Sequence, residues 1–542
     1  MSRHESIDAV LRYHEQTKHH FFRYARGPGG LDWANQPDPF RRYAGAPLVQ
    51  LPLLAADEAP LYEDLYRPGA IAAAPLAIRT LSRFLEYALA ISAWKQAGEV
   101  RWALRSNPSS GNLHPTEGYL ALGALPGLAP FPALYHYAPR EHALELRAEI
   151  APEGFAPLMR GFPPGAFLLG LASVNWREAW KYGERAFRYC QHDAGHAIGA
   201  ARIAARTLGW RMRLLEGVSD DTVAALLGID RDQDFEGAER EHPDCLAAVW
   251  PGDQPLGAAT SVSLPRKLVQ PWHGKANRLS RDDPVEWPLL AEVETASWKS
   301  TAQHLEIDLK TPSPSGAARD GPTAGQVIRQ RRSALAFDGS TSIPAARFFA
   351  MLARVTPGDM PFDVLTWRPA MHLAIFAHRV DGLAPGLYML ARDAATTGAL
   401  RAATHAHYAW TPPPGCPQGL ALFLLQEGDA RGLAAELSCR QAIAGDGAFS
   451  LGMIAEFEPR LREHGAWFYR RLFWEAGVIG QVLYLEAEAA GVRATGIGCF
   501  FDDPVHEVLG FKDRAFQSLY HFTTGAPVDD PRLTTLPAYG PP

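Results

Sequence analysis

Residues 184–208 read ERAFRYCQHDAGHAIGAARIAARTL and predict the most regular element of the chain. Alanine is abundant and apolar residues recur at a spacing of 3.6, so we expect a long helix that is buried on most of its sides. Gly209 follows directly and is typical of a helix end. A second stretch of this kind, residues 468–490, ends in the same way at Gly491.

The two helices belong to a longer internal repeat. Four pairs of anchors share one offset without a gap: Ala194-Gly195 with Ala476-Gly477, Gly209 with Gly491, Asp220-Asp221 with Asp502-Asp503, and Leu227-Gly228 with Leu509-Gly510. Upstream, residues 127–130 match 382–385, and Leu134-Tyr135 matches Leu387-Tyr388. Six anchors in one order predict two copies of one fold, fused like a two-fold homodimer in one chain. A ligand site between the copies would draw groups from both.

With 542 residues the chain is too long for one ordinary core. We expect an N-terminal arm over residues 1–60 that wraps the first domain, a first domain over 61–250, a linker rich in proline and serine over 251–320, and a second domain over 321–542. Helices are predicted over 76–94 and 222–227 and from Pro344 onward, and strands over 117–125 and 372–376.

Bulk composition excludes several classes of protein. Net charge is −6, apolar residues make up 47% and charged residues 21%, and no basic run suggests nucleic acid or an anionic membrane. No run of about 18 apolar residues predicts a membrane span. The polar N-terminus does not resemble a secretory signal. The five cysteines are scattered without C-x-x-C, so we expect reduced thiols in a cytoplasmic protein, with Cys499 as a small buried residue rather than a redox thiol.

Residues 107–115, NPSSGNLHP, place two hydroxyls, an amide, a glycine and two prolines in one short stretch. The prolines restrict the backbone, Gly111 admits φ values that other residues resist, and the polar groups can bind a planar polar ligand. The alternative is an ordinary surface turn.

Arg331-Arg332-Ser333 opens the second copy and suits a phosphate, because a forked, permanently charged donor stands beside a small hydroxyl. The alternative is a solvated basic helix end. We expect this segment and the 107–115 turn to meet at one ligand.

These motifs carry a resemblance to a known family. Arg331-x-Ser333 followed by Phe337-Asp338, the Pro-Ser-Ser-x-Asn turn, and a Gly-x-Gly-x-Phe segment after a long helix resemble the nitroreductase-like FMN flavoproteins. The 181–189 segment KYGERAFRY narrows the resemblance to SagB-type dehydrogenases, which include azoline oxidases of ribosomal peptide natural products. It covers residues 61–250 and 322–535.

The resemblance implies an α+β fold: two nitroreductase-like domains, each a mostly antiparallel sheet flanked by helices, fused as a pseudo-two-fold dimer with FMN at the interface. It implies that the phosphate or ribityl chain is held by Arg331 and Ser333, together with Arg332 and with Arg532 near the C-terminus. The first copy would line the isoalloxazine or ribityl side with Pro108, Ser109, Ser110 and Asn112, and Gly496 and Gly498 would approach flavin N5. Leu335 stands where many relatives have a second basic residue.

The copies differ in a complementary way. The first has Arg67-Pro68 where the second has Arg332-Ser333, and the second has residues 367–372 where the first has its serine-rich turn. One composite site therefore keeps all its parts, which predicts one FMN per chain.

Lys181 and Tyr182 are the catalytic candidates, because azoline oxidases use a Lys-Tyr pair here for proton removal. A lysine acts as a base only if burial or charge lowers its pKa; the alternative is an exposed loop pair. His192 and His196 have zinc-like spacing but no third ligand, so we expect helix packing or ring stacking and no metal. His114 could reach the flavin, and the two Asp-Asp pairs are expected to cap the helices that follow them.

The predicted function is that of an FMN-dependent oxidoreductase that moves hydride between flavin and a small molecule or peptide, such as a thiazoline or oxazoline, with O2 reoxidising the flavin. One alternative is an NAD(P)H-dependent nitro or quinone reductase. Another is a non-catalytic scaffold or partner protein.

Overall fold

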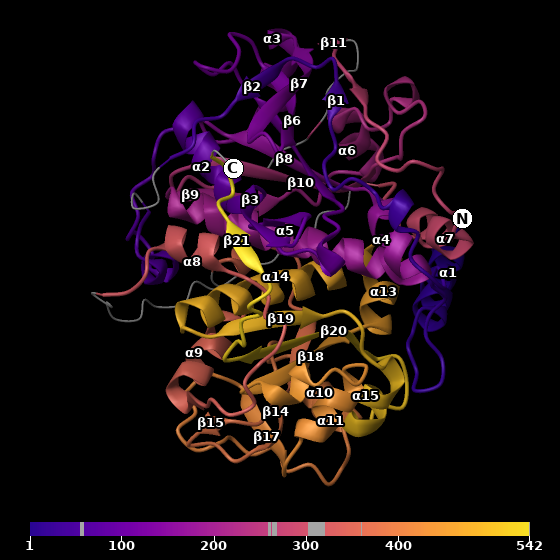
Figure 1. Cartoon of the computed structure of the whole chain (residues 1–542), viewed down its shortest axis with the longest axis vertical. Coiled ribbons are helices and arrows are strands. Elements are labelled where there is room, and N and C mark those ends of the chain that lie inside the picture. The colour runs from indigo at the N-terminus through magenta and orange to yellow at the C-terminus, as the bar shows by residue number, and fades with distance from the viewer. Residues whose placement is uncertain (55–58, 258–261, 263–267, 302–319, 359, 541–542) are drawn as a thin grey trace.

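The computed structural model describes residues 1–54, 59–257, 262, 268–301, 320–358 and 360–540. Figure 1 shows two sheets, one in each half of the molecule, with the helices α5 (Ala186–Thr207) and α14 (Phe468–Ala489) crossing between them. Much of the predicted 251–320 linker, including its proline- and serine-rich run at 311–316, lies outside the described residues.

The first half is built on a sheet of order β11-β7-β6-β5-β8-β10-β9, with β2 also paired to β7. All its strand pairs are antiparallel. Its strands are β2 (Leu48–Gln50), β5 (Thr116–Leu122), β6 (Ala133–Ala138), β7 (Ala143–Ile150), β8 (Phe167–Ser173), β9 (Trp210–Leu214), β10 (His242–Pro251) and β11 (Val269–Trp272). Around it lie α1 (Arg3–Gln16), α2 (Ile78–Ala88), α3 (Pro152–Leu158), α4 (Asn175–Tyr182), α6 (Asp220–Leu227), α7 (Pro288–Ala296) and the short pair β1 (Tyr43–Ala44) and β12 (Lys275–Ala276).

The second half repeats this plan with the order β17-β16-β14-β18-β20-β19, again antiparallel throughout. Its strands are β14 (Met371–Ala377), β16 (Gly386–Leu390), β17 (Leu422–Glu427), β18 (Phe449–Glu456), β19 (Arg493–Ile497) and β20 (Phe516–Gly525). Its remaining elements are α8 (Ala324–Gln330), α9 (Ala345–Arg354), α10 (Thr397–Ala403), α11 (Arg431–Leu437), α12 (Ile443–Asp446), α13 (Glu458–His464), α15 (Asp502–Leu509), β13 (Ile343–Pro344) and β15 (Val380–Asp381).

The two halves correspond element by element. The bounds of α14 and α15 equal those of α5 and α6 at the common offset of the sequence repeat. Gly228 and Gly510, one anchor pair, end α6 and α15 in the left-handed conformation at φ 70° and 91°. The predicted α+β class, with two domains of one fold joined as a pseudo-dimer, is confirmed.

A pair of repeat glycines explains how α5 and α14 pack. A Cβ on Gly195 would lie 2.5 Å from the Trp474 carbonyl oxygen, and one on Gly477 would collide with the His192 carbonyl oxygen. Both obstacles are backbone, which cannot move aside as a flexible side chain would. The glycines therefore let two buried helices touch near the pseudo-two-fold axis.

Ion pairs tie the halves together in the same reciprocal way. Arg188 of the first half donates to Asp502 of the second at 2.7 Å, and Arg470 of the second half pairs with Asp220 of the first. The prediction that Asp220 and Asp502 cap helices needs correction, since they stand in the first turns of α6 and α15 and Ser219 caps α6. Their carboxylates instead neutralise buried arginines across the interface.

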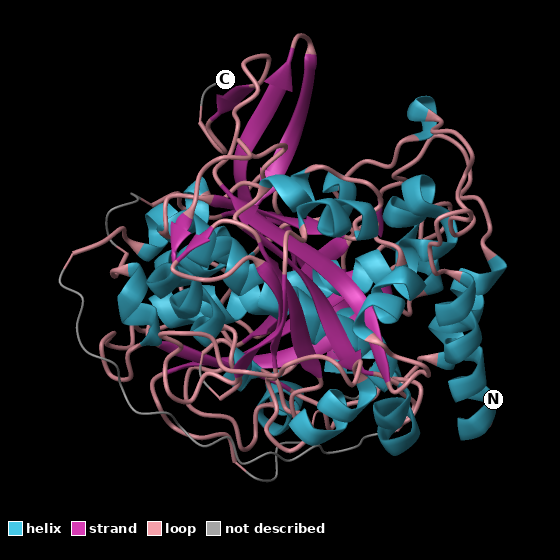
Figure 2. Cartoon of the chain, turned by 90° about the horizontal axis from the view of Figure 1, so that it is seen from below, coloured by secondary structure: helices cyan, strands magenta, loops and turns pink. Residues whose placement is uncertain are grey.

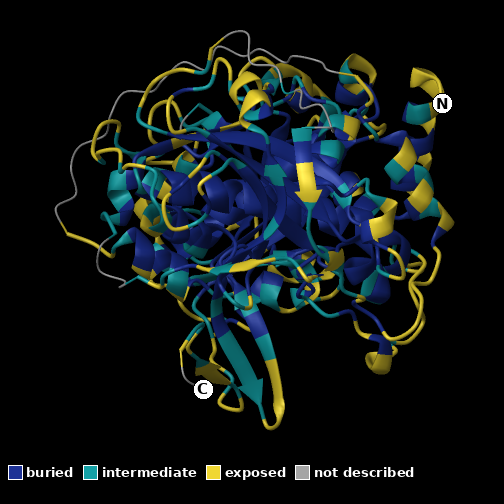
Figure 3. Cartoon of the chain, turned by 90° about the horizontal axis from the view of Figure 1, so that it is seen from above, coloured by how far each residue is buried: buried dark blue, intermediate teal, exposed yellow. Residues whose placement is uncertain are grey.

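The helix predicted over 76–94 was too long. It ends at Ala88, and β3 (Ile91–Ala97) forms a hairpin with β4 (Val100–Arg105). The C-terminal strand β21 (Thr534–Leu536) pairs with β3, so the end of the second half completes a small sheet of the first. In Figure 2 this three-stranded sheet projects from the body, and Figure 3 shows it more exposed than the helices and strands at the centre of the molecule.

The N-terminal arm contacts both halves rather than wrapping the first alone. In α1, Tyr13 donates to the Glu184 carbonyl oxygen at 2.7 Å, and His14 lies 3.3 Å from the Tyr469 hydroxyl of α14. No helix within the described ranges is long and apolar enough to cross a membrane.

Candidate functional site

A cavity of about 960 Å³ opens between the two halves. Ser109 of the first half and Ser333 of the second both line it, so the two stretches expected to meet do meet. The predicted binding residues on its wall are Pro108, Ser109, Ser110, Asn112, Arg331, Arg332, Ser333, Gly496 and Gly498, and Tyr182 joins them. Residues from the C-terminal segment, including Asp529 and Thr535, close one side.

The serine-rich turn is held in shape by its own polar groups. Gly111, Asn112 and His114 all have positive φ, at 58°, 60° and 53°. The Ser109 hydroxyl accepts from the His114 amide at 2.8 Å, and the Asn112 amide donates to the Ala103 carbonyl oxygen at 2.9 Å. The turn therefore presents a fixed wall to a ligand, and the side-chain NH2 of Asn112 already has a protein acceptor.

Asp193 of α5 anchors this turn and was missed at the sequence level. Its carboxylate accepts from the Ser110 amide at 3.0 Å and from the Ser110 hydroxyl at 2.9 Å. Burial raises the pKa of Asp193 to about 7, against the lowering effect of its serine donors. Because it also lines the cavity, Asp193 is a group that can exchange a proton there near neutral pH.

The Arg331–Ser333 segment crosses from the second half to the first. Arg331 is buried and donates to the carbonyl oxygens of Arg105 and Ser106, directly before the serine-rich turn. The Ser333 hydroxyl lies 2.9 Å from the Tyr484 hydroxyl, which also accepts from the Gly496 amide at 2.9 Å. The Arg331–Ser333 segment of the second half is therefore fixed against the serine-rich turn of the first half.

Cations gather at this end of the cavity. Burial, followed by the nearby Arg331, lowers the pKa of Arg332 to about 10. Burial also lowers the pKa of Lys95, and Arg332 and Arg493 lower it further. Mutual repulsion of these cations favours an anion among them, and of these only Arg493 has a carboxylate partner within the described residues, Asp529 at 2.9 Å. Lys95 and Arg493 were not predicted. Lys95 lies on β3, which begins inside the helix expected over 76–94, although the Gly98-Glu99 turn could have indicated a hairpin.

The cavity wall also carries buried polar atoms that lack partners within the described part of the chain. They are Arg105 Nε, His114 Nδ1, His196 Nδ1 and Arg331 Nε. An unpaired buried donor costs about 1–3 kcal/mol. Burial lowers the pKa of His196 to about 3 and that of His114 well below its usual range, so both rings are neutral. A ligand with an anionic end would satisfy the two arginine donors, whereas the neutral His114 ring donates through Nε2 to the Ala103 carbonyl oxygen and offers Nδ1 as an acceptor.

Gly496 and Gly498 line the wall where aromatic rings press close. A Cβ on Gly496 would collide with the Tyr520 hydroxyl, and one on Gly498 with the Tyr189 ring. Bare backbone is therefore required at both positions. The absence of a Cβ thus makes room for the Tyr520 and Tyr189 side chains, and the approach of this turn to a flavin stays a prediction.

Lys181 and Tyr182 end α4 beside the serine-rich turn. A Cβ on Gly111 would lie 2.6 Å from the Tyr182 hydroxyl and 3.2 Å from Lys181 Nζ. Tyr182 lines the cavity, while Lys181 stands behind it and is half-buried. Burial raises the pKa of Tyr182 well above its usual range, so its hydroxyl keeps its proton at neutral pH.

Three other predicted residues have different surroundings. Arg532 does not line the cavity: its side chain is 84% exposed and paired with Asp530 at 2.7 Å. His192 stacks on Tyr520 at 4.1 Å, as expected of a packing residue, and no cluster suited to a metal occurs among the described residues. Cys499 is half-buried and lines the cavity, which corrects the prediction of a buried residue.

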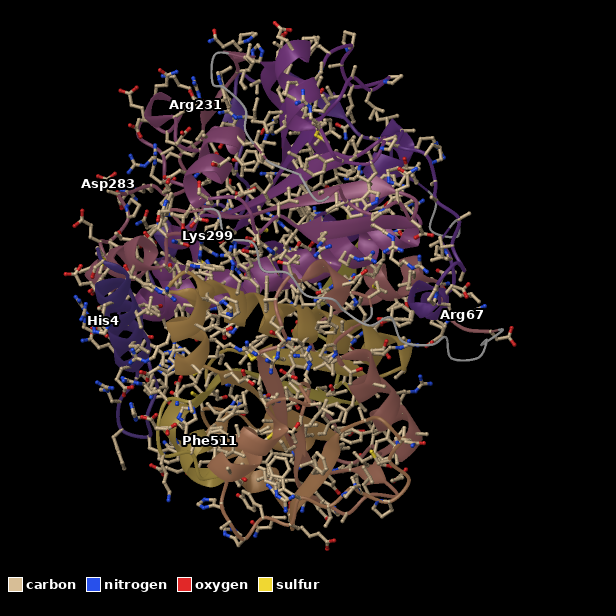
Figure 4. All side chains as sticks on the ribbon, turned by 180° about the vertical axis from the view of Figure 1, so that it is seen from behind. His4, Arg67, Arg231, Asp283, Lys299 and Phe511 are labelled. Carbon is tan, nitrogen blue, oxygen red and sulfur yellow. The ribbon has the colours of Figure 1, made fainter. Side chains whose placement is uncertain are left out.

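A smaller cavity of about 440 Å³ occupies the pseudo-symmetric position. It is bordered by Tyr66, Pro68 and Gly69; Arg67 of this segment is labelled at the edge of the molecule in Figure 4. Arg202 lines it and makes a forked pair to Asp363, at 2.9 and 2.7 Å.

Comparison with solved structures identifies the fold. The chain aligns with a crystal structure of a protein from Anabaena variabilis assigned as a nitroreductase, at TM-score 0.67 and 22% identity over 96% of this chain and 99% of that one. The fold is that of the nitroreductases. A Ralstonia eutropha protein with the same assignment (TM-score 0.28, 17% identity, 41% of this chain and 95% of that one) and the Escherichia coli microcin synthetase McbBCD complex with truncated pro-MccB17 bound (0.26, 21%, 40% and 70%) align in part. No family model and no curated protein matches the chain.

Proposed function

We propose that the chain is an FMN-dependent oxidoreductase of the nitroreductase-like family, with one FMN in the cavity between its halves. The observation that carries this proposal is the set of unpartnered donors and crowded cations on one wall of that cavity. A flavin phosphate would neutralise the cations, and the ring system has polar atoms for the remaining donors. The volume lies at the upper end of typical ligand pockets.

The binding residues follow from this placement. The phosphate would lie among Lys95, Arg332 and Arg493, with Ser333 and Arg331 beside it. The isoalloxazine would lie toward the serine-rich turn, between Tyr182 and the Gly496–Gly498 backbone. Bound FMN supplies two-electron hydride chemistry.

The protein's own groups would handle protons and exclude water. Tyr182 keeps its hydroxyl proton, so it suits a donor or relay. Lys181, behind Tyr182, is then the base for the ring proton of a thiazoline or oxazoline in a peptide. That substrate class, O2 as oxidant and a cytoplasmic location belong to the proposal on the strength of the sequence resemblance to SagB-type dehydrogenases.

An absorbance spectrum of the purified full chain, followed by titration with FMN, tests the first part. We expect bound flavin that saturates at one per chain. A chain that neither contains nor binds FMN would instead be a scaffold. Anaerobic addition of NADPH or NADH then separates the two enzymes, since rapid bleaching of the flavin identifies the reductase.

Lys181→Ala tests the catalytic assignment on an azoline-containing peptide. We expect turnover to fall about 10²-fold, a typical contribution of a positioned base, with FMN affinity unchanged. Lys275→Ala removes an exposed lysine and is the matched control. Full turnover in Lys181→Ala would remove the base from the mechanism and leave the flavin site intact.

A further inference from the structure

Two cysteines far apart in the sequence face each other at the cavity wall. The Sγ atoms of Cys439 and Cys499 lie 2.6 Å apart. Cys499 follows the Gly496–Gly498 turn and lines the cavity, and Cys439 follows α11. Both are half-buried, unlike Cys190 and Cys245, which are buried in the interior.

The two chain segments that carry Cys439 and Cys499 are joined by hydrogen bonds on either side of the cysteine pair. The Phe501 amide donates to the Leu437 carbonyl oxygen at 2.8 Å, and the Gln441 side chain donates to the Cys499 carbonyl oxygen at 3.1 Å. Cys439 is held at φ 54°, an uncommon conformation for a residue other than glycine. The two sulfurs are therefore held together by the surrounding backbone.

We propose that Cys439 and Cys499 form a redox-active dithiol that exchanges with small disulfides entering the cavity. Cys499 is the attacking thiol because it lines the cavity, and Cys439, which is not among the lining residues, is the resolving thiol. The proposal goes beyond the flavin function and does not depend on it.

The exchange balances in two steps. The Cys499 thiolate attacks one sulfur of a small disulfide, whose S–S bond breaks, and one small thiolate leaves. Cys439 then attacks the Cys499 sulfur, its proton passes to a leaving thiolate, and the second small thiol departs. The protein pair is oxidised to one disulfide, and the small disulfide is reduced to two thiols.

The electrostatic surroundings agree with these roles. The contact between the sulfurs lowers the pKa of Cys499 and raises that of Cys439. Arg185 lowers the pKa of both thiols, whereas burial and Asp502, the salt-bridge partner of Arg185, raise it. Arg185 also donates to the Gly498 carbonyl oxygen at 3.2 Å. A cation beside a half-exposed thiol is typical of reactive cysteines.

The test uses the full chain and 2-hydroxyethyl disulfide as the probe, with thiols counted after unfolding and intact mass measured. The wild type should lose two of its five thiols without a lasting adduct, and dithiothreitol should restore them. Cys439→Ser should retain one mixed disulfide at Cys499, mapped by peptide mass. Cys499→Ser should form no adduct at Cys439.

Cys416→Ser removes the other half-buried cysteine and is the control, expected to behave as wild type. Loss of the two thiols should be at least about tenfold faster than adduct formation at Cys416. A wild type that keeps all five thiols, or an adduct at Cys439 in Cys499→Ser, overturns the proposal. Flavin absorbance of the same samples reports FMN separately, so failure of the flavin function is recognised independently.

Discussion

The two pseudo-equivalent cavities show how one fold repeated twice can keep a single site. At the composite cavity, Lys95, Arg331 and Arg332 have no salt bridge within the described residues, and several donors lack partners. At its counterpart Arg202 pairs with Asp363 and Arg211 pairs with Asp253 at 2.9 Å, while Arg206 donates to the carbonyl oxygens of Leu65 and Arg67. The two cavities therefore differ in how far the protein's own carboxylates neutralise the cations on their walls.

The largest effect is expected from a substitution that disturbs the contact between the two halves, because that contact creates both cavities. Gly195→Val places a branched side chain against the Trp474 backbone, where nothing can give way. We expect a loss of about 3 kcal/mol or more in the free energy of unfolding, at the upper end for overpacking. Urea unfolding measures it. Gly432→Ala, in α11 with open space around it, should be neutral or slightly stabilising. Equal stability of both variants would contradict the packing argument.

Removing one cation should affect the two cavities very differently. Arg332→Ala deletes a charge-assisted contact worth about 2 kcal/mol, so the Kd for FMN should rise roughly 30-fold. Fluorescence quenching of FMN measures it. Arg211→Ala at the counterpart cavity removes a partly exposed arginine and should leave the Kd unchanged. If Arg211→Ala raises the Kd for FMN as much as Arg332→Ala does, FMN does not bind selectively in the composite cavity.

Asp193 offers a test through pH. Its pKa is raised from an unfolded value near 4 to about 7, so the folded state holds the extra proton in that window and stability falls as pH rises through it. Asp193→Asn removes this contribution and keeps an acceptor for Ser110. The melting temperature of the wild type relative to the variant should therefore drop between pH 4.5 and 7.5, by about 1 °C for each kcal/mol in a chain of this length. A constant difference across that range would show that Asp193 does not titrate there.

The smallest expected effect concerns the counterpart cavity itself. Asp363→Asn breaks the Arg202 pair but leaves the narrow cavity without the serine-rich turn. Calorimetry should still find one FMN per chain, with the Kd within about twofold of wild type. A second equivalent of bound FMN would show that the ion pair alone had closed the site.

Much of this molecule could be read from local pattern. The spacing of apolar residues gave α5 and α14 to within a few residues, because a buried helix repeats its contacts along one strip of sequence. The anchors Gly195 and Gly477 indicated the repeat, and the structure shows why both are glycine, since only glycine permits two backbones to touch. The pairing of the 107–115 turn with Arg331–Ser333 was predicted because the first copy lacks the Arg-Ser segment and the second copy lacks the serine-rich turn.

Tertiary structure alone decided the remainder. Lys95 reaches the cavity on β3, to which β21 returns to pair, a contact between distant parts of the chain that no local pattern encodes. Asp193 and the Cys439–Cys499 pair act through desolvation and proximity, which exist only after distant segments pack. The sequence by itself determined two copies of one fold and the residue types of one site. Packing decided which cations stay unpaired, because only folding sets which charges lose water and which find a partner.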